Sequence, residues 1–235
     1  MRAAVVVFPG TWSDADCVYA LEQVGVEARR VWHRETRIDP DELVVLAGGF
    51  SYGDYLRCGA IARFSPIMSA VQAHASAGGL VIGICNGFQI LCEAGLLPGV
   101  LMRNASLQFR CQEVHLVVES QASPFTAGIE AGHALRLPIS HGEGNYFADA
   151  ATLDRLEDSG RIAFRYCEAD ASITPAANPN GSQRNIAGVL NERGNVLGMM
   201  PHPERACDRR LGSEDGNMIW RSMLTALAAP LERTI

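Results

Sequence analysis

The sequence predicts an α/β fold with an open, mostly parallel sheet covered by helices. Continuous β-branched runs at Ala3–Phe8 and Leu43–Ala47 are typical of strands buried on both faces, and Glu27–Trp32 is a further strand. A helical pattern lies between Ala3–Phe8 and Glu27–Trp32, which gives the β-α-β order of a parallel sheet.

The first two helices follow from apolar spacing. One carries its apolar residues at helical intervals after Ser13 or Asp14, either of which can cap it, and ends at Gly25. The other spans about residues 65–77 and ends at the glycine pair 78–79. Their packing residues are Cys17, Ala20, Leu21 and Val24 in the first, and Ile67, Met68, Val71 and Ala75 in the second.

The pattern changes after residue 100. Short alternating runs between about residues 103 and 134 predict antiparallel strands at the sheet edge. Ile162–Cys167 is another predicted strand, and Ile186–Leu190 with Val196–Met199 predicts a hairpin. A final helix is expected over residues 216–229. It should bury Ile219, Trp220, Met223, Leu224 and Leu227.

Two polar stretches in this half carry no regular pattern. Asn178–Ser182 has the composition of a turn. Pro138–Tyr146 is rich in glycine and polar groups, and composition leaves a substrate or partner loop and an irregular connection equally open.

Size and charge restrict the class of protein. The chain has 235 residues without repeat or linker, so a single domain over residues 1–235 is expected. Its 26 acidic against 20 basic side chains argue against nucleic acid or an anionic membrane as partner. The first apolar run is too short for a signal peptide, and no run has membrane-spanning length. Seven scattered cysteines suggest neither disulfides nor a metal site, so a cytoplasmic protein is expected.

The motif Gly83-x-Cys85-x-Gly87 is the most informative stretch. It joins an apolar strand to a helix, and its spacing is that of a nucleophile elbow with a thiol as nucleophile. Such a turn crowds the flanking backbone, so glycine is required on both sides, and it places the sulfur at the positive helix end. The alternative is a buried structural cysteine.

The loop after the third strand, Gly48–Arg57, would lie at the same sheet edge. Its Gly48-Gly49 pair would let backbone N–H groups approach an oxyanion, although a flexible turn is the simpler interpretation of two glycines. Neither a P-loop nor a dinucleotide-binding glycine motif is present.

Among six histidines, His202 is the best candidate for a base. Pro201 and Pro203 should hold the segment extended, so that His202 and Glu204 project from one face. A carboxylate beside an imidazole fixes its tautomer, as in a catalytic triad. An incidental histidine in a proline-rich turn is the alternative, and His141 remains a second candidate.

With these motifs the sequence resembles the class-I, or triad, glutamine amidotransferases. Within the class it is most similar to the glutaminase subunits of phosphoribosylformylglycinamidine synthase, a purine-pathway enzyme. The segments that carry the resemblance span nearly the whole chain: 6–10, 48–57, 83–89, 140–146, 178–182 and 198–205. Two departures are the loop at residues 10–14 and Cys58, where a small alanine is usual.

The resemblance implies a flavodoxin-like sheet with an antiparallel edge extension and assigns roles to residues. Cys85 would form a thioester with glutamine and release ammonia, with His202 as base and Glu204 as its orienting partner. The N–H groups of Gly49 and Asn86 would hold the oxyanion. The substrate glutamine would contact Gln89.

The resemblance also implies partners. A larger synthetase subunit would bind ATP, magnesium and formylglycinamide ribonucleotide and receive the ammonia, and a small accessory subunit is a further candidate. No cofactor is expected on this chain. A class-I glutaminase of another pathway, a cysteine hydrolase of similar fold and a non-catalytic regulatory subunit are the alternatives.

Overall fold

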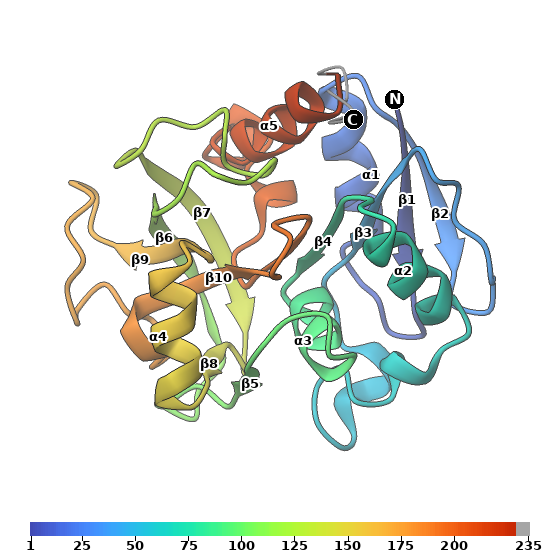
Figure 1. The fold of residues 1–235 in the computed structure, drawn as a ribbon. Helices are drawn as coiled ribbons and strands as arrows, with labels where there is room; N and C mark the ends of the chain where they lie inside the picture. Colours follow the sequence, from blue (N-terminus) through green and yellow to red (C-terminus); the bar gives the residue numbers. More distant parts are fainter. Residues whose placement is uncertain (229–235) are drawn as a thin grey trace.

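The computed structural model describes residues 1–228 (Figure 1). Nine of their strands form one sheet in the order β2-β1-β3-β4-β11-β10-β9-β6-β7, and β5 and β8 form a second, two-stranded sheet. The strands are β1 (Arg2–Val7), β2 (Glu27–Trp32), β3 (Glu42–Leu46), β4 (Val81–Ile84), β5 (Val100–Met102), β6 (Arg110–Val118), β7 (Ala134–His141), β8 (Asn145–Phe147), β9 (Ile162–Cys167), β10 (Ile186–Leu190) and β11 (Val196–Met199). The helices are α1 (Asp14–Gln23), α2 (Ile67–Ser76), α3 (Asn86–Glu93), α4 (Ala150–Asp158) and α5 (Gly216–Ala228).

The sheet has two halves, as expected from the change of pattern along the chain. Strands β2, β1, β3, β4 and β11 are parallel to one another. Strands β10, β9, β6 and β7 continue the sheet with antiparallel pairing. The predicted fold class, a parallel α/β sheet with an antiparallel edge, is therefore confirmed, and so is the β10–β11 hairpin.

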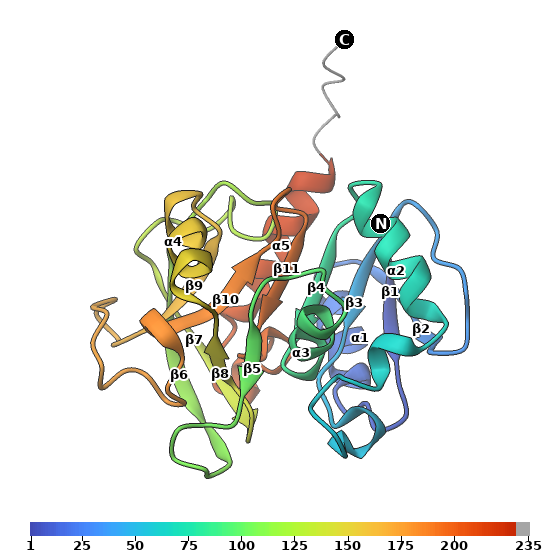
Figure 2. The same ribbon diagram turned by 60° about the horizontal axis from the view of Figure 1, so that its bottom comes forward.

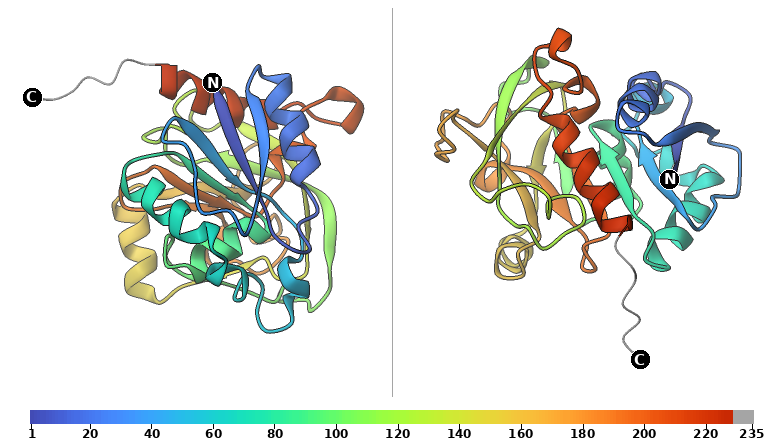
Figure 3. Two further views of the ribbon diagram at one scale, coloured as in Figure 1. Left: turned by 90° about the vertical axis from the view of Figure 1, so that its right-hand side faces the viewer. Right: turned by 90° about the horizontal axis from the view of Figure 1, so that it is seen from above.

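Helices cover both faces of the sheet. Helices α2, α3 and α4 lie on one face, and α1 and α5 lie on the other, where both contact the segment 203–205 (Figures 2 and 3). Strands β3 and β4 are buried along their whole length, which explains their continuous apolar sequences. None of the helices in residues 1–228 is long and apolar enough to cross a membrane.

The antiparallel half contains the main departures from the sequence prediction. Residues 138–141 belong to strand β7 and residues 145–146 to strand β8, which pairs with β5 in a separate small sheet. The irregular connection, one of the two alternatives left open for Pro138–Tyr146, is therefore wrong for most of its length, because alternate side chains of β7 are buried. The other alternative, a substrate or partner loop, stays a prediction, and residues 140–143 line a cavity. Helix α4 was not expected. The side chain of Leu227 and residue 229 lie outside what the structure describes.

Three loops meet at one edge because their strands are adjacent and parallel. Strand β4 lies between β3 and β11, so the residues that follow these three strands emerge side by side. The backbone N–H of Cys85 donates to the carbonyl of Met199 at 2.8 Å, which ties the start of one loop to the end of strand β11. This arrangement brings residues 49, 85 and 202 to a common place.

Candidate active site

Cys85 lies on a strained turn between β4 and α3. Its backbone has φ 51° and ψ −107°, a region that residues with a side chain rarely adopt and that costs about 1–3 kcal/mol. The residue caps the N-terminus of α3, where free N–H groups favour negative charge. Its side chain is only 5% exposed, and that small opening faces a cavity. These are the features of a nucleophile elbow.

The two flanking glycines are required by space. A Cβ on Gly87 would lie 2.0 Å from the carbonyl oxygen of Leu46, and one on Gly83 would lie 2.6 Å from the backbone of Gly87. Both distances are well inside van der Waals contact with backbone atoms that have no freedom to move. Crowding by the neighbouring backbone therefore requires glycine at both positions, as the sequence predicted.

His202 and Glu204 form a buried pair. The His202 Nδ1 lies 2.6 Å from the Glu204 Oε1, and both residues are 1% exposed. The extended conformation expected for this segment is wrong beyond His202, because Pro203–Arg205 forms a single 3₁₀ turn. Proline is tolerated at the first position of such a turn, and the turn folds the carboxylate back onto the imidazole.

The imidazole of His202 faces Cys85. A Cβ placed on Gly48 would lie 3.0 Å from the His202 Cε1 and 3.5 Å from the Cys85 Cβ, so both side chains pack over this glycine. The buried Nε2 of His202 has no hydrogen-bond partner within the described residues. Burial lowers the pKa of His202, but the charge of Glu204 and the Cys85 sulfur outweigh it and raise the pKa to about 9. The imidazole is thereby a stronger acceptor for a thiol proton.

Gly49 presents its N–H group on the side away from the neighbouring loop. In the bridge between Thr11 and Gly49, the hydrogen bonds run from Phe50 to Gly10 and from Trp12 to Gly48, which leaves the N–H of Gly49 out of the pairing. A Cβ on Gly49 would lie 2.6 Å from the Gly10 carbonyl oxygen, and its φ is +152°. Only glycine fits here, as expected for a residue whose backbone approaches a reacting oxygen.

Asn86 and Gln89 belong to a chain of amide hydrogen bonds. The Asn86 Oδ1 accepts from the N–H of Ser51, its Nδ2 donates to the Gln89 Oε1, and the Gln89 Nε2 donates to the Glu143 carbonyl at 2.7 Å. The backbone N–H of Asn86 is the first of α3 and so belongs to the unpaired helix end. Gln89 lines the cavity, but both ends of its amide are already bonded, one to Asn86 on α3 and the other to the Glu143 carbonyl across the cavity.

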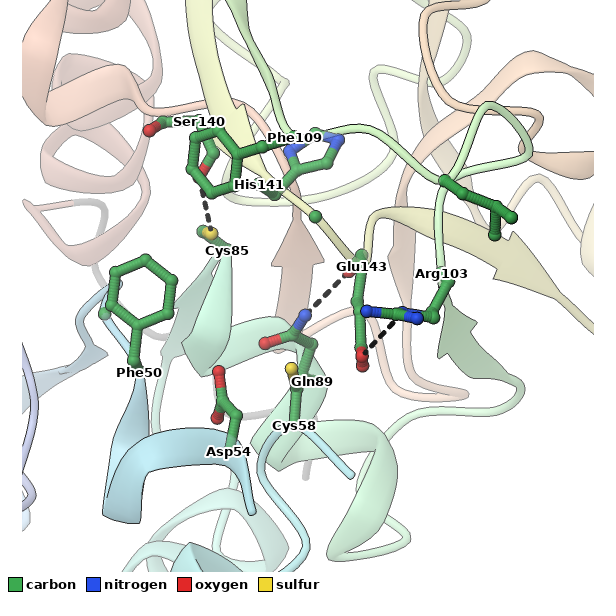
Figure 4. Close-up of a pocket in the computed structure, with 13 residues that line it drawn as sticks. Phe50, Asp54, Cys58, Cys85, Gln89, Arg103, Phe109, Ser140, His141 and Glu143 are labelled. Atoms are coloured by element: carbon green, nitrogen blue, oxygen red, sulfur yellow. Dashed lines mark hydrogen bonds and ion pairs between the residues drawn. The ribbon is translucent and has the colours of Figure 1, made fainter. Parts of the chain in front are cut away.

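A cavity of about 360 Å³ opens from Cys85 (Figure 4). Its lining comes from the loop after β3, from α3, from the segment 103–109 and from the end of β7. Cys85 lies beneath the carbonyl of Ser140, with its Sγ 3.7 Å from that oxygen. Residues 1–228 contain no group of three or more histidine, cysteine, aspartate or glutamate side chains that could hold a metal ion.

The sequence did not reveal what holds the cavity wall at 141–144. Asn180 is buried, and its Nδ2 lies 3.1 Å from the His141 Nε2 and 2.9 Å from the Gly144 carbonyl oxygen. Burial first, and then His202, lower the pKa of His141 to about 3, so His141 is neutral at physiological pH. The composition of Asn178–Ser182 indicates only a turn, and nothing in it signals that one amide would be buried.

Comparison with known proteins identifies the class. A family model described as the CobB/CobQ-like glutamine amidotransferase domain matches residues 1–220, and the chain belongs to this family.

Closer relatives define the type of glutamine amidotransferase. The chain is 58% identical over 225 residues to the phosphoribosylformylglycinamidine synthase subunit PurQ of Moorella thermoacetica, covering 95% of each chain. It is 54% identical to the PurQ subunit of Bradyrhizobium diazoefficiens, covering 99% of each. A solved structure titled PurLQS, from Thermotoga maritima, contains a chain with 44% identity and a TM-score of 0.86, covering 96% of this chain and 98% of that one.

Proposed function

We propose that this chain is the glutaminase subunit of a phosphoribosylformylglycinamidine synthase. The observation that carries the proposal is the meeting of Cys85, the free face of Gly49 and the His202–Glu204 pair at the ends of three adjacent strands. Residues 1–235 form one glutamine amidotransferase domain that works in the cytoplasm. The similarity to PurQ subunits supports the pathway, and the geometry supports the chemistry.

The first half of the reaction forms a thioester. The proton of the Cys85 thiol passes to the Nε2 of His202, whose raised pKa lets the ring hold it as an imidazolium. The Cys85 thiolate then attacks the side-chain amide carbon of glutamine. The oxyanion is held by the N–H groups of Gly49 and Asn86. His202 then gives the proton to the leaving nitrogen, the C–N bond breaks, and ammonia leaves a glutamyl thioester on Cys85.

The second half regenerates the free cysteine. His202 takes a proton from water, the hydroxide attacks the thioester carbon, and glutamate is released as the C–S bond breaks and Cys85 leaves as a thiolate beside the protonated ring of His202. Glu204 keeps the imidazole in the required tautomer throughout. Ammonia passes to a larger synthetase subunit, where ATP and magnesium activate formylglycinamide ribonucleotide, with a small accessory subunit as a candidate third component.

A diazo-ketone analogue of glutamine tests the assignment. The reagent is expected to alkylate the chain once, and peptide mapping should place the label on the peptide that contains Cys85. Cys111 is exposed and serves as an internal control, because a reagent that reacts with accessible thiols without recognition would label it as well. A label on any peptide other than that of Cys85 would overturn the assignment.

Gly49→Ala should reduce glutamine hydrolysis by about 10²- to 10³-fold, the effect of losing one oxyanion donor. The new Cβ would meet the Gly10 carbonyl oxygen at 2.6 Å, so the loop must shift and carry its N–H group away. Gly25→Ala is the matched control, because Gly25 also has positive φ but has no atom within 4 Å of a Cβ. Glutamine turnover and thermal stability are both measured for each variant and for the wild type. Equal turnover in the two would show that Gly49 is not a donor.

A further inference from the structure

The cavity has a second end that the reaction steps leave unassigned. Cys85 and Ser140 lie at one end, and Asp54 and Glu143 lie at the other (Figure 4). Arg103 and Gln89 also line this second end. A glutamine whose amide lies over Cys85 would place its amino-acid head group there.

Asp54 is the carboxylate at this end that lacks a cation. Glu143 faces Arg103, with 3.9 Å between the guanidinium Nε and the carboxylate. Arg57, close to Asp54 along the chain, is paired with Glu93. The Oδ1 of Asp54 is inaccessible to solvent and has no hydrogen-bond partner among the described residues.

An unpaired, buried carboxylate oxygen is costly for the empty protein. Desolvation disfavours the ionised form, so burial raises the pKa of Asp54; the Cys58 and Asn86 side chains lower this pKa by hydrogen bonding to the carboxylate, but they do not offset the burial. Three successive residues, Tyr52, Gly53 and Asp54, have φ of 55°, 74° and 53°, so the loop makes a tight turn where Asp54 enters the cavity lining. An ammonium group in the cavity that Asp54 lines would supply the opposite charge that this carboxylate lacks.

We propose that Asp54 binds the α-ammonium group of glutamine and so selects an α-amino acid as the substrate. The inference rests on the proposed function and adds a specificity-determining residue to it. Two carboxylates against one guanidinium leave this end of the cavity with a net negative charge, which suits the ammonium group. Gln89 is then a positioning residue, because its amide links α3 to Glu143 while Asp54 contacts the substrate.

The test compares three ligands in the complex of the full chain with its synthetase subunit. L-Glutamine carries both head groups, glutaramate lacks the α-ammonium, and the amide of γ-aminobutyric acid lacks the α-carboxylate. Calorimetry on the Cys85→Ala background measures binding without turnover, and the second variant adds Asp54→Asn, which keeps the side-chain size. Asp158→Asn is the control, since Asp158 is an exposed residue on α4.

Asp54→Asn should weaken L-glutamine and the γ-aminobutyric amide by about 100-fold each, the loss expected for one charge-assisted hydrogen bond in a partly closed site. Binding of glutaramate should change less than threefold, so that glutamine loses its advantage over it. Asp54→Glu, which keeps the charge, should recover part of the affinity.

Equal weakening of all three ligands, or none, would overturn the role of Asp54. Failure of the proposed function gives a different result. In that case the parent Cys85→Ala complex would bind no glutamine and the wild-type complex would release no glutamate.

Discussion

Replacing Cys85 with alanine should lower glutamine-dependent amidation by about 10⁴-fold or more while leaving ammonia-dependent amidation at its wild-type rate. The sulfur is the only atom of the residue that forms a bond with substrate in the proposed mechanism. Alanine retains the Cβ that packs against Gly48 and can keep the backbone of the elbow. The measurement is product formation by the complex with glutamine or an ammonium salt as the nitrogen source.

Two controls make this result interpretable. Cys111→Ala removes an exposed thiol on β6 and should leave both activities unchanged. Thermal unfolding of Cys85→Ala should stay close to the wild type, because the strained φ of 51° remains and only one sulfur atom beside the cavity is lost. Loss of both activities together would mean that Cys85 supports the structure of the complex instead of the chemistry.

The sequence predicted those parts of the site that depend on local backbone geometry. The glycines at 83 and 87 are dictated by contacts within one turn and its neighbouring strand, so their spacing alone identifies the elbow. The burial of the parallel strands also followed from local patterns, because such strands have continuous apolar sequences, whereas their order in the sheet is known only from the structure. The adjacency of β3, β4 and β11 then placed Gly49 and His202 beside Cys85.

What the sequence could not provide depends on contacts between distant segments. The 3₁₀ turn at Pro203–Arg205 is stabilised by tertiary packing against α1 and α5, and the proline pattern alone favours an extended chain. The burial of Asn180 depends on strand β7 and the loop after it. The lack of a cation beside the Asp54 carboxylate appears only once Arg57 and Arg103 are seen to be paired with other residues.

Glu204→Gln should reduce glutamine hydrolysis by about 10²- to 10⁴-fold through its effect on His202. Two opposing effects set the pKa of His202: burial lowers it, and the Glu204 charge and Cys85 raise it to about 9. Without the carboxylate, burial prevails and the pKa of His202 must fall. Arg205 also lowers the pKa of His202 in this variant. Its Nε lies 3.8 Å from the Glu204 Oε1, and once the carboxylate is gone its positive charge is no longer neutralised and disfavours a protonated imidazole.

The titration of His202 separates this role from a merely structural one. In the wild type the ring should stay protonated through neutral pH and lose its proton near pH 9, whereas in Glu204→Gln the loss should occur at lower pH. Histidine ring resonances of the full chain report this directly, with the exposed Glu192→Gln as control. A variant that loses stability but keeps its titration near pH 9 would show that Glu204 only holds the turn. A variant with both the lower pKa and slow hydrolysis would show that the carboxylate is what makes His202 a sufficient base for the Cys85 thiol.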